Sequence, residues 1–145
     1  MAVKVLNNCE SLNLADLMQE LNSMYKVHHP NTIQLLGAVI NAKPYMIVYE
    51  FMTGGSVIDT LSIGGNFSQW RSLMLAIDLA KGLDHLHDRP IPIIHGDLRP
   101  SNLLLGGSRV FNRYHKDLTT DEIGVLKIAD FGTSLCEFDS IFLVV

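Results

Sequence analysis

The chain has 145 residues, of which 48% are hydrophobic, so it carries enough apolar side chains for one core and is not expected to be disordered. Its formal net charge is −4 and it has no run of Lys or Arg. This argues against nucleic-acid and anionic-membrane partners, because both require concentrated positive charge. The N-terminus lacks the apolar core of a secretory signal, and no stretch approaches the ~20 apolar residues that span a bilayer. Cys9 and Cys136 have no partner at metal-ligand spacing, so we expect a reducing, cytoplasmic setting without a zinc site or a disulfide framework.

The first third of the chain predicts strands around one helix. Residues alternate in the manner of a short strand from Ala2 to Leu6, and apolar residues recur at helical spacing from Leu14 to Tyr25. Two apolar, β-rich runs follow at Ile33–Ile40 and Tyr45–Phe51. The polar segment 41–44 between them is a good hairpin connection.

The longest predicted helix begins after Ser68, which is suited to cap it, and runs to Arg89. Its apolar face is expected to contain Leu73, Ile77, Ala80, Leu83 and either Leu86 or His87. The Met and Trp residues at helical spacing are expected in the core, and these are Met18, Met24, Trp70 and Met74.

Shorter elements surround this helix. Val57–Leu61 predicts a short helix, and three apolar runs predict short strands that frame polar loops. These runs are Ile93–His95, Leu103–Leu105 and Val125–Ile128.

Three polar residues in these loops suggest phosphoryl-transfer chemistry. Asp97 and Asn102 lie five residues apart, and Asp130 adds a third oxygen ligand ahead of Phe131 and Gly132. A transferring phosphoryl group carries dispersed negative charge, so its site must supply Mg²⁺ ligands, a cation and an acceptor for the incoming hydroxyl proton.

These segments resemble the catalytic loop and the Asp-Phe-Gly motif of the protein kinase family. The resemblance implies that Asp97 accepts the substrate hydroxyl proton, and that Asn102 and Asp130 hold Mg²⁺. Arg99 would stand near the γ-phosphate, where kinases of the serine/threonine type usually have Lys.

The same resemblance extends to the nucleotide. Lys4, in the first strand, corresponds to the lysine that grips the α- and β-phosphates of ATP, and Glu20, on the following helix, to its ion-pair partner. The two are therefore a predicted pair.

The run after the hairpin resembles the kinase hinge. Tyr49 is the expected gatekeeper, while the Glu50 carbonyl and the Met52 amide are the expected adenine contacts. Ala2 and Leu104 would sandwich the adenine ring.

Four further residues match the stacked apolar column that links the two kinase lobes. They are Met24, Leu35, His95 and Phe131.

The resemblance implies an α+β, two-lobe protein-kinase-like fold that is truncated at both ends. The parts are expected at 1–49 for the N-lobe, 50–55 for the hinge and 56–145 for the upper C-lobe. Neither the glycine-rich loop strands nor most of the C-lobe is recognisable. A polar insertion at 109–122 lengthens the interval before Asp130, and Gly96 replaces the arginine that reads activation-loop phosphate in many kinases.

Each site residue also has an ordinary structural explanation. Lys4 alone would be a strand lysine, Glu20 a solvated helix residue, and Asp97 and Asn102 turn formers. Their occurrence in the family's order over most of the chain favours the functional interpretation.

Three hypotheses about function remain open. The first is a protein kinase that uses ATP and Mg²⁺ to phosphorylate a protein hydroxyl, with Ser/Thr favoured over Tyr as the acceptor and with regulatory protein partners in signal transduction. The second is a non-catalytic, pseudokinase-like module that binds nucleotide or serves as a scaffold. The third is a chain that does not fold stably alone, because apolar surfaces meant for absent helices would be exposed.

Overall fold

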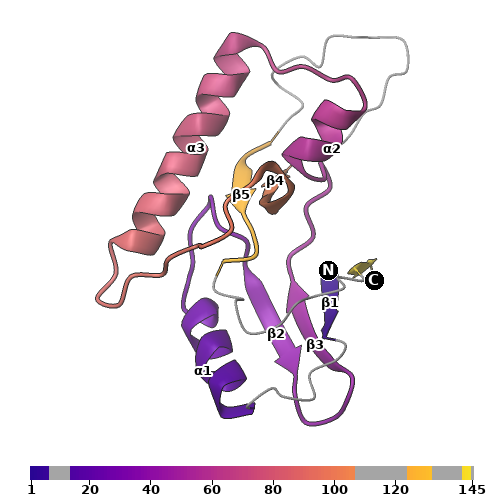
Figure 1. Cartoon of the computed structure of the whole chain (residues 1–145), viewed down its shortest axis with the longest axis vertical. Helices are drawn as coiled ribbons and strands as arrows, with labels where there is room; N and C mark the ends of the chain where they lie inside the picture. Colours follow the sequence, from indigo (N-terminus) through magenta and orange to yellow (C-terminus); the bar gives the residue numbers. More distant parts are fainter. Residues whose placement is uncertain (7–13, 107–123, 132–141, 145) are drawn as a thin grey trace. The chain divides into compact units, whose positions relative to one another are not determined.

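A computed structural model describes the fold for residues 1–6, 14–106, 124–131 and 142–144 (Figure 1). The chain divides into two compact units. The sheet unit comprises the described residues of Met1–His28 and Ile33–Phe51, together with 142–144. The loop unit comprises the described residues of His29–Thr32 and Met52–Phe131.

The sheet unit is a four-stranded antiparallel sheet with one helix. Its strand order is β2 (Leu35–Val39), β3 (Tyr45–Tyr49), β1 (Ala2–Leu6) and β6 (Phe142–Val144). Helix α1 (Leu14–Tyr25) packs against β2. The predicted helix and the three predicted strands of this region are confirmed, apart from one or two residues at the strand ends.

Strand β6 was not predicted. It pairs with β1 over three residues, with Ala2 opposite Val144 and Lys4 opposite Phe142. The run Phe-Leu-Val has high β-propensity, but three residues are too few for a prediction from composition. The register of β6 is therefore set by its pairing with β1, which joins opposite ends of the chain.

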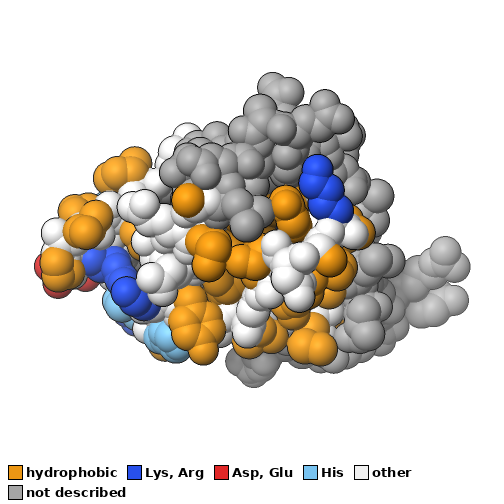
Figure 2. Space-filling model, turned by 90° about the horizontal axis from the view of Figure 1, so that it is seen from below, with side chains coloured by type: hydrophobic (Ala, Val, Ile, Leu, Met, Phe, Trp, Pro, Cys, Tyr) orange, Lys and Arg blue, Asp and Glu red, His pale blue; other side chains and the backbone are white. Residues whose placement is uncertain are grey.

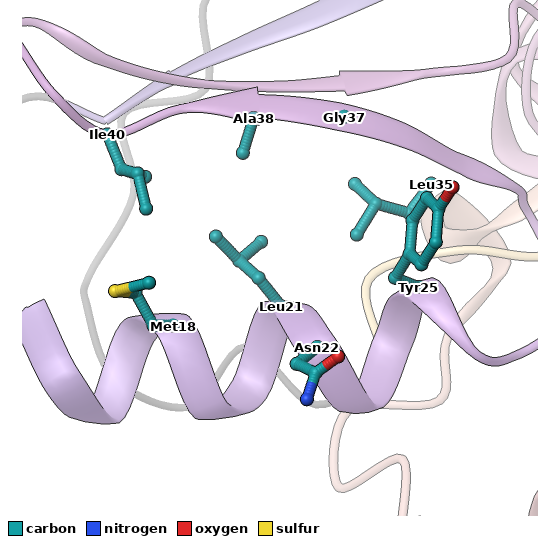
Figure 3. A pocket seen from close by; sticks show the side chains of 8 residues that line it. All are labelled: Met18, Leu21, Asn22, Tyr25, Leu35, Gly37, Ala38 and Ile40. Carbon is teal, nitrogen blue, oxygen red and sulfur yellow. The ribbon is translucent and has the colours of Figure 1, made fainter.

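A small apolar pocket lies between α1 and β2 (Figure 3). Its volume is about 210 Å³. It is lined by Met18, Leu21, Asn22 and Tyr25 of the helix and by Leu35, Gly37, Ala38 and Ile40 opposite. The small side chains at Gly37 and Ala38 leave this gap, because they do not fill the space over the helix. None of these eight described residues carries a carboxylate.

The loop unit combines helices with a two-stranded sheet. Helix α2 (Val57–Ser62) precedes α3 (Gln69–His87), and the 3₁₀ turn η1 (Pro100–Asn102) leads into β4 (Leu103–Leu105). Strand β5 (Leu126–Ile128) pairs with β4 in antiparallel fashion.

A serine caps the start of α2 and of α3 in this unit. The Ser68 side chain accepts a hydrogen bond from the Arg71 amide at 3.1 Å, which confirms the predicted cap of α3. Ser56 caps α2 in a capping box with Asp59, an arrangement that satisfies two helix-end donors reciprocally.

The buried face of α3 differs from the predicted apolar stripe. Its buried residues are Arg71, Leu75, Gly82 and Leu86, whereas Leu73 is 51% and Ile77 is 37% exposed. The face with Gly82 is buried because the segment 29–32 and β5 approach it closely: a Cβ on Gly82 would lie 2.7 Å from the Asn31 carbonyl oxygen. Close backbone approach, rather than the count of apolar side chains, selects the face.

Three other predictions are corrected by the structure. Trp70 and Met18 are 62% and 51% exposed, so they are not core residues, whereas Met24 is buried as predicted. Residues 93–95 form no strand, and the Ile93 amide instead donates to the Leu86 carbonyl at the end of α3. The run is apolar although it pairs with no strand, and Ile94 is exposed to solvent.

Several large hydrophobic side chains of the described residues are exposed to solvent, among them Ile91 at 82% and Ile94 at 71%. Figure 2 shows one face, on which hydrophobic side chains occupy a large share and Lys and Arg side chains occupy little.

None of the described helices combines the length and apolar character that crossing a bilayer requires. The predicted insertion 109–122 and both cysteines lie outside the described residues.

His29 and His85 stack in the loop unit, with ring centroids 4.8 Å apart and planes inclined by 17°. The His29 Nδ1 atom accepts a hydrogen bond from the Asn31 amide at 3.1 Å. Burial lowers the pKa of His29 below its usual 6.5, and the charges of His85, Lys81 and Lys127 lower it further, while Asp84 opposes them.

We expect Gly82→Ala to destabilise the chain by about 1–2 kcal/mol, because the overpacking cost exceeds the gain in helix propensity. The added Cβ would also lie 2.7 Å from Ile128 Cδ1, so two neighbours must move. Gly37→Ala is the matched control, since nothing lies within 4 Å of its Cβ. Denaturant unfolding measures both, and equal stability of the two variants would contradict the packing argument.

Stability should also fall as the pH drops below about 6.5, because a depressed folded-state pKa means that the unfolded chain binds the His29 proton first. The stabilisation is complete above the unfolded pKa and is lost on acidification towards the folded pKa. Thermal melts between pH 8 and pH 5 should show a shallower decline in His29→Gln than in the wild type. The exposed neighbour His28→Gln should keep the wild-type slope, and a wild-type slope in His29→Gln would refute the assignment.

Candidate active site

The polar residues of the candidate site lie on a short loop in the loop unit. The segment from His95 to Arg99 is irregular, and Pro100 then begins the turn η1, which ends at Asn102. Proline fixes its own φ and has no amide to satisfy, so it suits the first position of a turn. Asn102, directly before β4, is 5% exposed.

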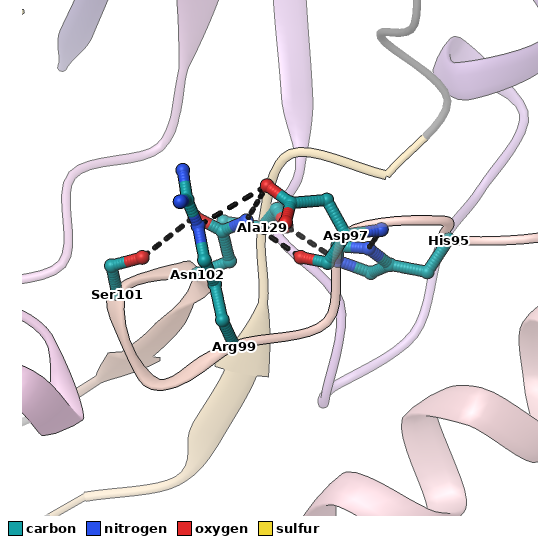
Figure 4. A network of polar contacts seen from close by, with 6 residues as sticks. All are labelled: His95, Asp97, Arg99, Ser101, Asn102 and Ala129. Atoms are coloured by element: carbon teal, nitrogen blue, oxygen red, sulfur yellow. Dashed lines mark hydrogen bonds and ion pairs between the residues drawn. The ribbon is translucent and has the colours of Figure 1, made fainter.

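Asp97, Arg99 and Asn102 form one polar network (Figure 4). Asn102 Nδ2 donates to the Asp97 carbonyl oxygen at 2.9 Å and to its carboxylate Oδ2 at 3.2 Å. Arg99 Nε lies 3.2 Å from the same Oδ2. The ion pair is exposed to solvent, with 63% of the Arg99 side chain and 60% of the Asp97 side chain accessible. The carboxylate is therefore held in place yet open to an incoming substrate.

The orientation of the Asn102 amide has a chemical consequence. Because its nitrogen is used by Asp97, its oxygen Oδ1 faces the other way, where Ser101 Oγ is a distant donor at 3.4 Å. An amide oxygen in this position is suited to contact a cation.

His95 links this loop to the segment that carries Asp130. Its Nδ1 accepts from the Asp97 amide at 3.2 Å, and its Nε2 lies 2.9 Å from the Ala129 carbonyl oxygen. Both bonds form only if the ring is neutral with its proton on Nε2. The sequence indicated His95 as a packing residue; it is 8% exposed and also makes these two polar contacts.

The backbone of Ala129 closes the arrangement. Its amide donates to the Asn102 carbonyl at 2.9 Å. The residue before Asp130 is therefore hydrogen-bonded to Asn102, the other predicted Mg²⁺ ligand. Asp130 itself has a positive φ of 57°, a left-handed conformation that aspartate tolerates better than most residues. Phe131 follows and is 1% exposed, which anchors the turn.

Asn102 and Asp130 fit a magnesium ion by the chemistry of their donors. One amide oxygen and one carboxylate are oxygen ligands of the kind Mg²⁺ prefers, and Mg²⁺ commonly takes only one or two protein carboxylates beside substrate phosphates and water. Among the described residues, no group of three His, Cys, Asp or Glu side chains could hold a metal ion. The donor set therefore suits an ion shared with a phosphate better than a metal held by the protein alone.

The predicted nucleotide lysine lies in the sheet unit. Lys4 is 1% exposed in the middle of β1 and opposite Ile47 of β3. A lysine is almost never buried to this extent without a partner, which makes a solvated strand lysine the wrong description. The side chain of Glu20 lies outside the described part, so the Lys4–Glu20 pair stays a prediction.

Of the predicted hinge residues, Tyr49 and Glu50 belong to the sheet unit and Met52 belongs to the loop unit. Ala2 and Tyr49 pair across β1 and β3, and Tyr49 is 5% exposed. The Glu50 carboxylate accepts from the Gln34 amide at 2.8 Å, while the Glu50 amide donates to the Gln34 carbonyl. Met52 belongs to the loop unit, and the adenine contacts assigned to these residues stay predictions.

Leu104 lies at the centre of β4, opposite Lys127, and forms an isolated bridge with Ser56. Its predicted adenine contact likewise remains untested. The residues of the predicted apolar column are all buried; Met24 and Leu35 belong to the sheet unit, and His95 and Phe131 belong to the loop unit.

The sequence did not single out two polar residues that contact the strand before Asp130. Asn31 Nδ2 donates to the Leu126 carbonyl at 2.9 Å, and Asp78 Oδ2 accepts from the Leu126 amide at 3.0 Å. An Asp within a helix is usually solvated, so helical periodicity gives no signal for such a contact.

Comparison with known proteins adds a family match. Residues 1–138 match the family model for protein tyrosine and serine/threonine kinases. The chain is 34% identical, over 86% of its length, to the serine/threonine-protein kinase VIK of Arabidopsis thaliana. It is 36% identical over 96% of its length to the serine/threonine-protein kinase STY17 of the same plant, and 33% identical over 98% to the dual specificity protein kinase pyk3 of Dictyostelium discoideum.

The aligned region is only a part of each relative. It covers 26% of VIK, 22% of STY17 and 9% of pyk3. The chain thus spans about a quarter or less of the length of these relatives.

Replacing His95 by Ala should lower the free energy of unfolding by about 2 kcal/mol, because the Asp97 amide and the Ala129 carbonyl lose their partner at a buried site. His87→Ala is the control, since His87 is exposed at the end of α3. Denaturant unfolding of both variants gives the difference. A His95 variant as stable as the His87 variant would mean that the loop is held by other contacts.

Proposed function

Because the chain belongs to the family of protein tyrosine and serine/threonine kinases, we propose that it transfers the γ-phosphoryl group of ATP to a serine or threonine hydroxyl of a protein. The observation that carries the proposal is the network around Asp97. A solvent-accessible carboxylate, fixed by Asn102 and Arg99, lies on the loop that is joined through Ala129 to Asp130.

In the proposed reaction, Asp97 acts on the incoming hydroxyl. The substrate oxygen forms a bond to the γ-phosphorus while the bond between that phosphorus and the β–γ bridging oxygen breaks. ADP leaves, and the hydroxyl proton passes to the Asp97 carboxylate. The Asn102 amide donates to Oδ2 and so orients the carboxylate for this contact.

Arg99 supplies positive charge beside Asp97. Its Nε lies 3.2 Å from Asp97 Oδ2, on the carboxylate that is proposed to accept the proton. With 63% of its side chain accessible, it is also free to approach an entering phosphate.

Asn102 and Asp130 are the proposed ligands of Mg²⁺. When bound, the ion neutralises charge on the transferring phosphates. The proposal is supported by the hydrogen bond from the amide of Ala129, the residue before Asp130, to the Asn102 carbonyl.

The remaining nucleotide contacts are proposed from the family match. Lys4, supported by Glu20, would hold the α- and β-phosphates, and the buried setting of Lys4 supports a role beyond solvation. The adenine ring would lie between Ala2 and Leu104, with Tyr49 as gatekeeper.

The hinge contacts of this proposal are the Glu50 carbonyl and the Met52 amide. A protein hydroxyl is the proposed substrate, and Ser/Thr is favoured over Tyr because several relatives are named serine/threonine kinases, although pyk3 is named a dual specificity kinase. Regulatory protein partners and a cytoplasmic setting complete the proposal.

Asp97→Asn should reduce phosphoryl transfer by about 100-fold or more while nucleotide binding is retained, because only proton acceptance is lost. Asp130→Ala should instead weaken binding of Mg·ATP. The measurements are the thermal melt of the 145-residue chain with and without Mg·ATP, and transfer of labelled phosphate to a mixed Ser/Thr protein substrate.

Asp88→Asn is the control for both variants, since Asp88 is an exposed residue at the end of α3. Retained transfer in Asp97→Asn would reject the base assignment. A wild-type chain that is stabilised by Mg·ATP but transfers no phosphate would instead favour the pseudokinase-like alternative.

A further inference from the structure

Strand β5 is short for a strand that leads to a candidate Mg²⁺ ligand. It has three residues, pairs with β4 along one edge, and ends two residues before Asp130. Three residues supply little pairing energy, so a strand of this length needs further contacts to keep a fixed register. Any slip of β5 would carry Asp130 with it.

The second edge of β5 pairs with no further strand of the described residues; it is held by polar groups and by one isolated parallel bridge between Ile128 and Thr32. The Leu126 amide donates to Asp78 Oδ2 at 3.0 Å, and the Leu126 carbonyl accepts from Asn31 Nδ2 at 2.9 Å. The Ile128 amide donates to the Asn31 carbonyl at 2.9 Å. These bonds satisfy backbone groups that a further strand would otherwise pair, at residues that are 1% and 0% exposed.

Helix α3 supplies a second contact to the same segment. Arg71 Nη2 donates to the Gly124 carbonyl at 2.6 Å, just before β5 begins. Arg71 and Asp78 are seven residues apart, so they lie on one face of α3, and α3 packs against β5. Burial lowers the pKa of Arg71, while the charge of Asp78 opposes the shift.

The path from α3 to the candidate Mg²⁺ site is therefore continuous. Asp78 fixes Leu126, β4 and Asn31 fix the rest of the strand, and Ala129 is fixed by Asn102 and His95. Each of these backbone bonds has one register in which it can form. Asp130 follows directly, in its left-handed conformation.

We infer that Asp78 is a positioning residue for Asp130: by accepting the Leu126 amide hydrogen bond, it fixes the register of β5 and thereby the separation of Asp130 from Asn102. This inference rests on the proposed function, which assigns Asp130 and Asn102 to Mg²⁺. Asp78 itself contacts neither substrate nor metal in this assignment, and it acts through the strand.

The test compares Asp78→Ala with Asp78→Asn in the 145-residue chain. Asparagine retains an oxygen that can accept from Leu126, whereas alanine has none. Mg²⁺ is titrated at fixed ATP, and the concentration that gives half-maximal nucleotide binding is measured. Hydrogen exchange of the backbone amides from Leu126 to Phe131 is followed on the same samples.

We expect Asp78→Ala to raise the Mg²⁺ requirement about 10-fold, as is typical when a residue that orients a metal ligand is lost. Exchange from Leu126 to Phe131 should become faster in the same variant. Asp78→Asn should stay within about 2-fold of the wild type, because the bond to Leu126 is kept. Asp84→Ala is the matched control, since Asp84 is an exposed aspartate on the same helix.

An unchanged Mg²⁺ requirement in Asp78→Ala overturns the inference, even if its melting temperature is lower, because a purely structural role predicts that result. If Asp78→Ala does not melt cooperatively, Asp78→Leu replaces it, since leucine keeps the volume and favours the helix but accepts no hydrogen bond. Failure of both to fold also overturns the positioning role.

A wild-type chain that binds no Mg·ATP would overturn the proposed function together with this role. Binding by the wild type with an unaltered Asp78→Ala variant would overturn the positioning role alone. The two failures are therefore distinguishable.

Discussion

The rest of the loop unit depends on how the backbone of Leu126–Ala129 is held. The register of this segment is fixed because its two edges are hydrogen-bonded to different partners: β4 on one side, and Asp78 and Asn31 on the other. A buried amide or carbonyl left without a partner is costly, so each of these bonds excludes alternative registers. The position of Asp130 follows from this constraint.

The same constraint explains the unusual buried face of α3. A helix that packs only through apolar side chains would bury Leu73 and Ile77, yet these are exposed while Arg71 is buried. Arg71 is buried with its Nη2 donating to the Gly124 carbonyl, while its buried Nε has no hydrogen-bond partner among the described residues, and Gly82 allows the Asn31 backbone to approach closely. One guanidinium hydrogen bond and a missing Cβ thus accompany the burial of this face in place of one with more apolar area.

The chemistry of the loop arises from short-range geometry. Within the turn that ends at Asn102, one amide side chain orients the Asp97 carboxylate and directs its own oxygen towards the opposite side. His95 then ties the start of the loop to Ala129. The Asp97 carboxylate and the Asn102 amide oxygen are thus arranged by neighbouring residues, whereas the position of Asp130 depends on bonds to distant parts of the chain.

The sequence by itself determined the order and type of most elements, the Ser68 cap, and the family membership that the match to residues 1–138 confirms. These are local properties: periodicity, capping side chains and the spacing of Asp97, Asn102 and Asp130. Only the tertiary structure decided which face of α3 is buried, that 93–95 is not a strand, and that β6 pairs with β1. The buried face of α3 and the β1–β6 pairing depend on contacts between residues far apart in the chain, whereas 93–95 is bonded both to the nearby Leu86 and to the distant Ala129. In each case hydrogen-bond satisfaction and close packing override the local pattern.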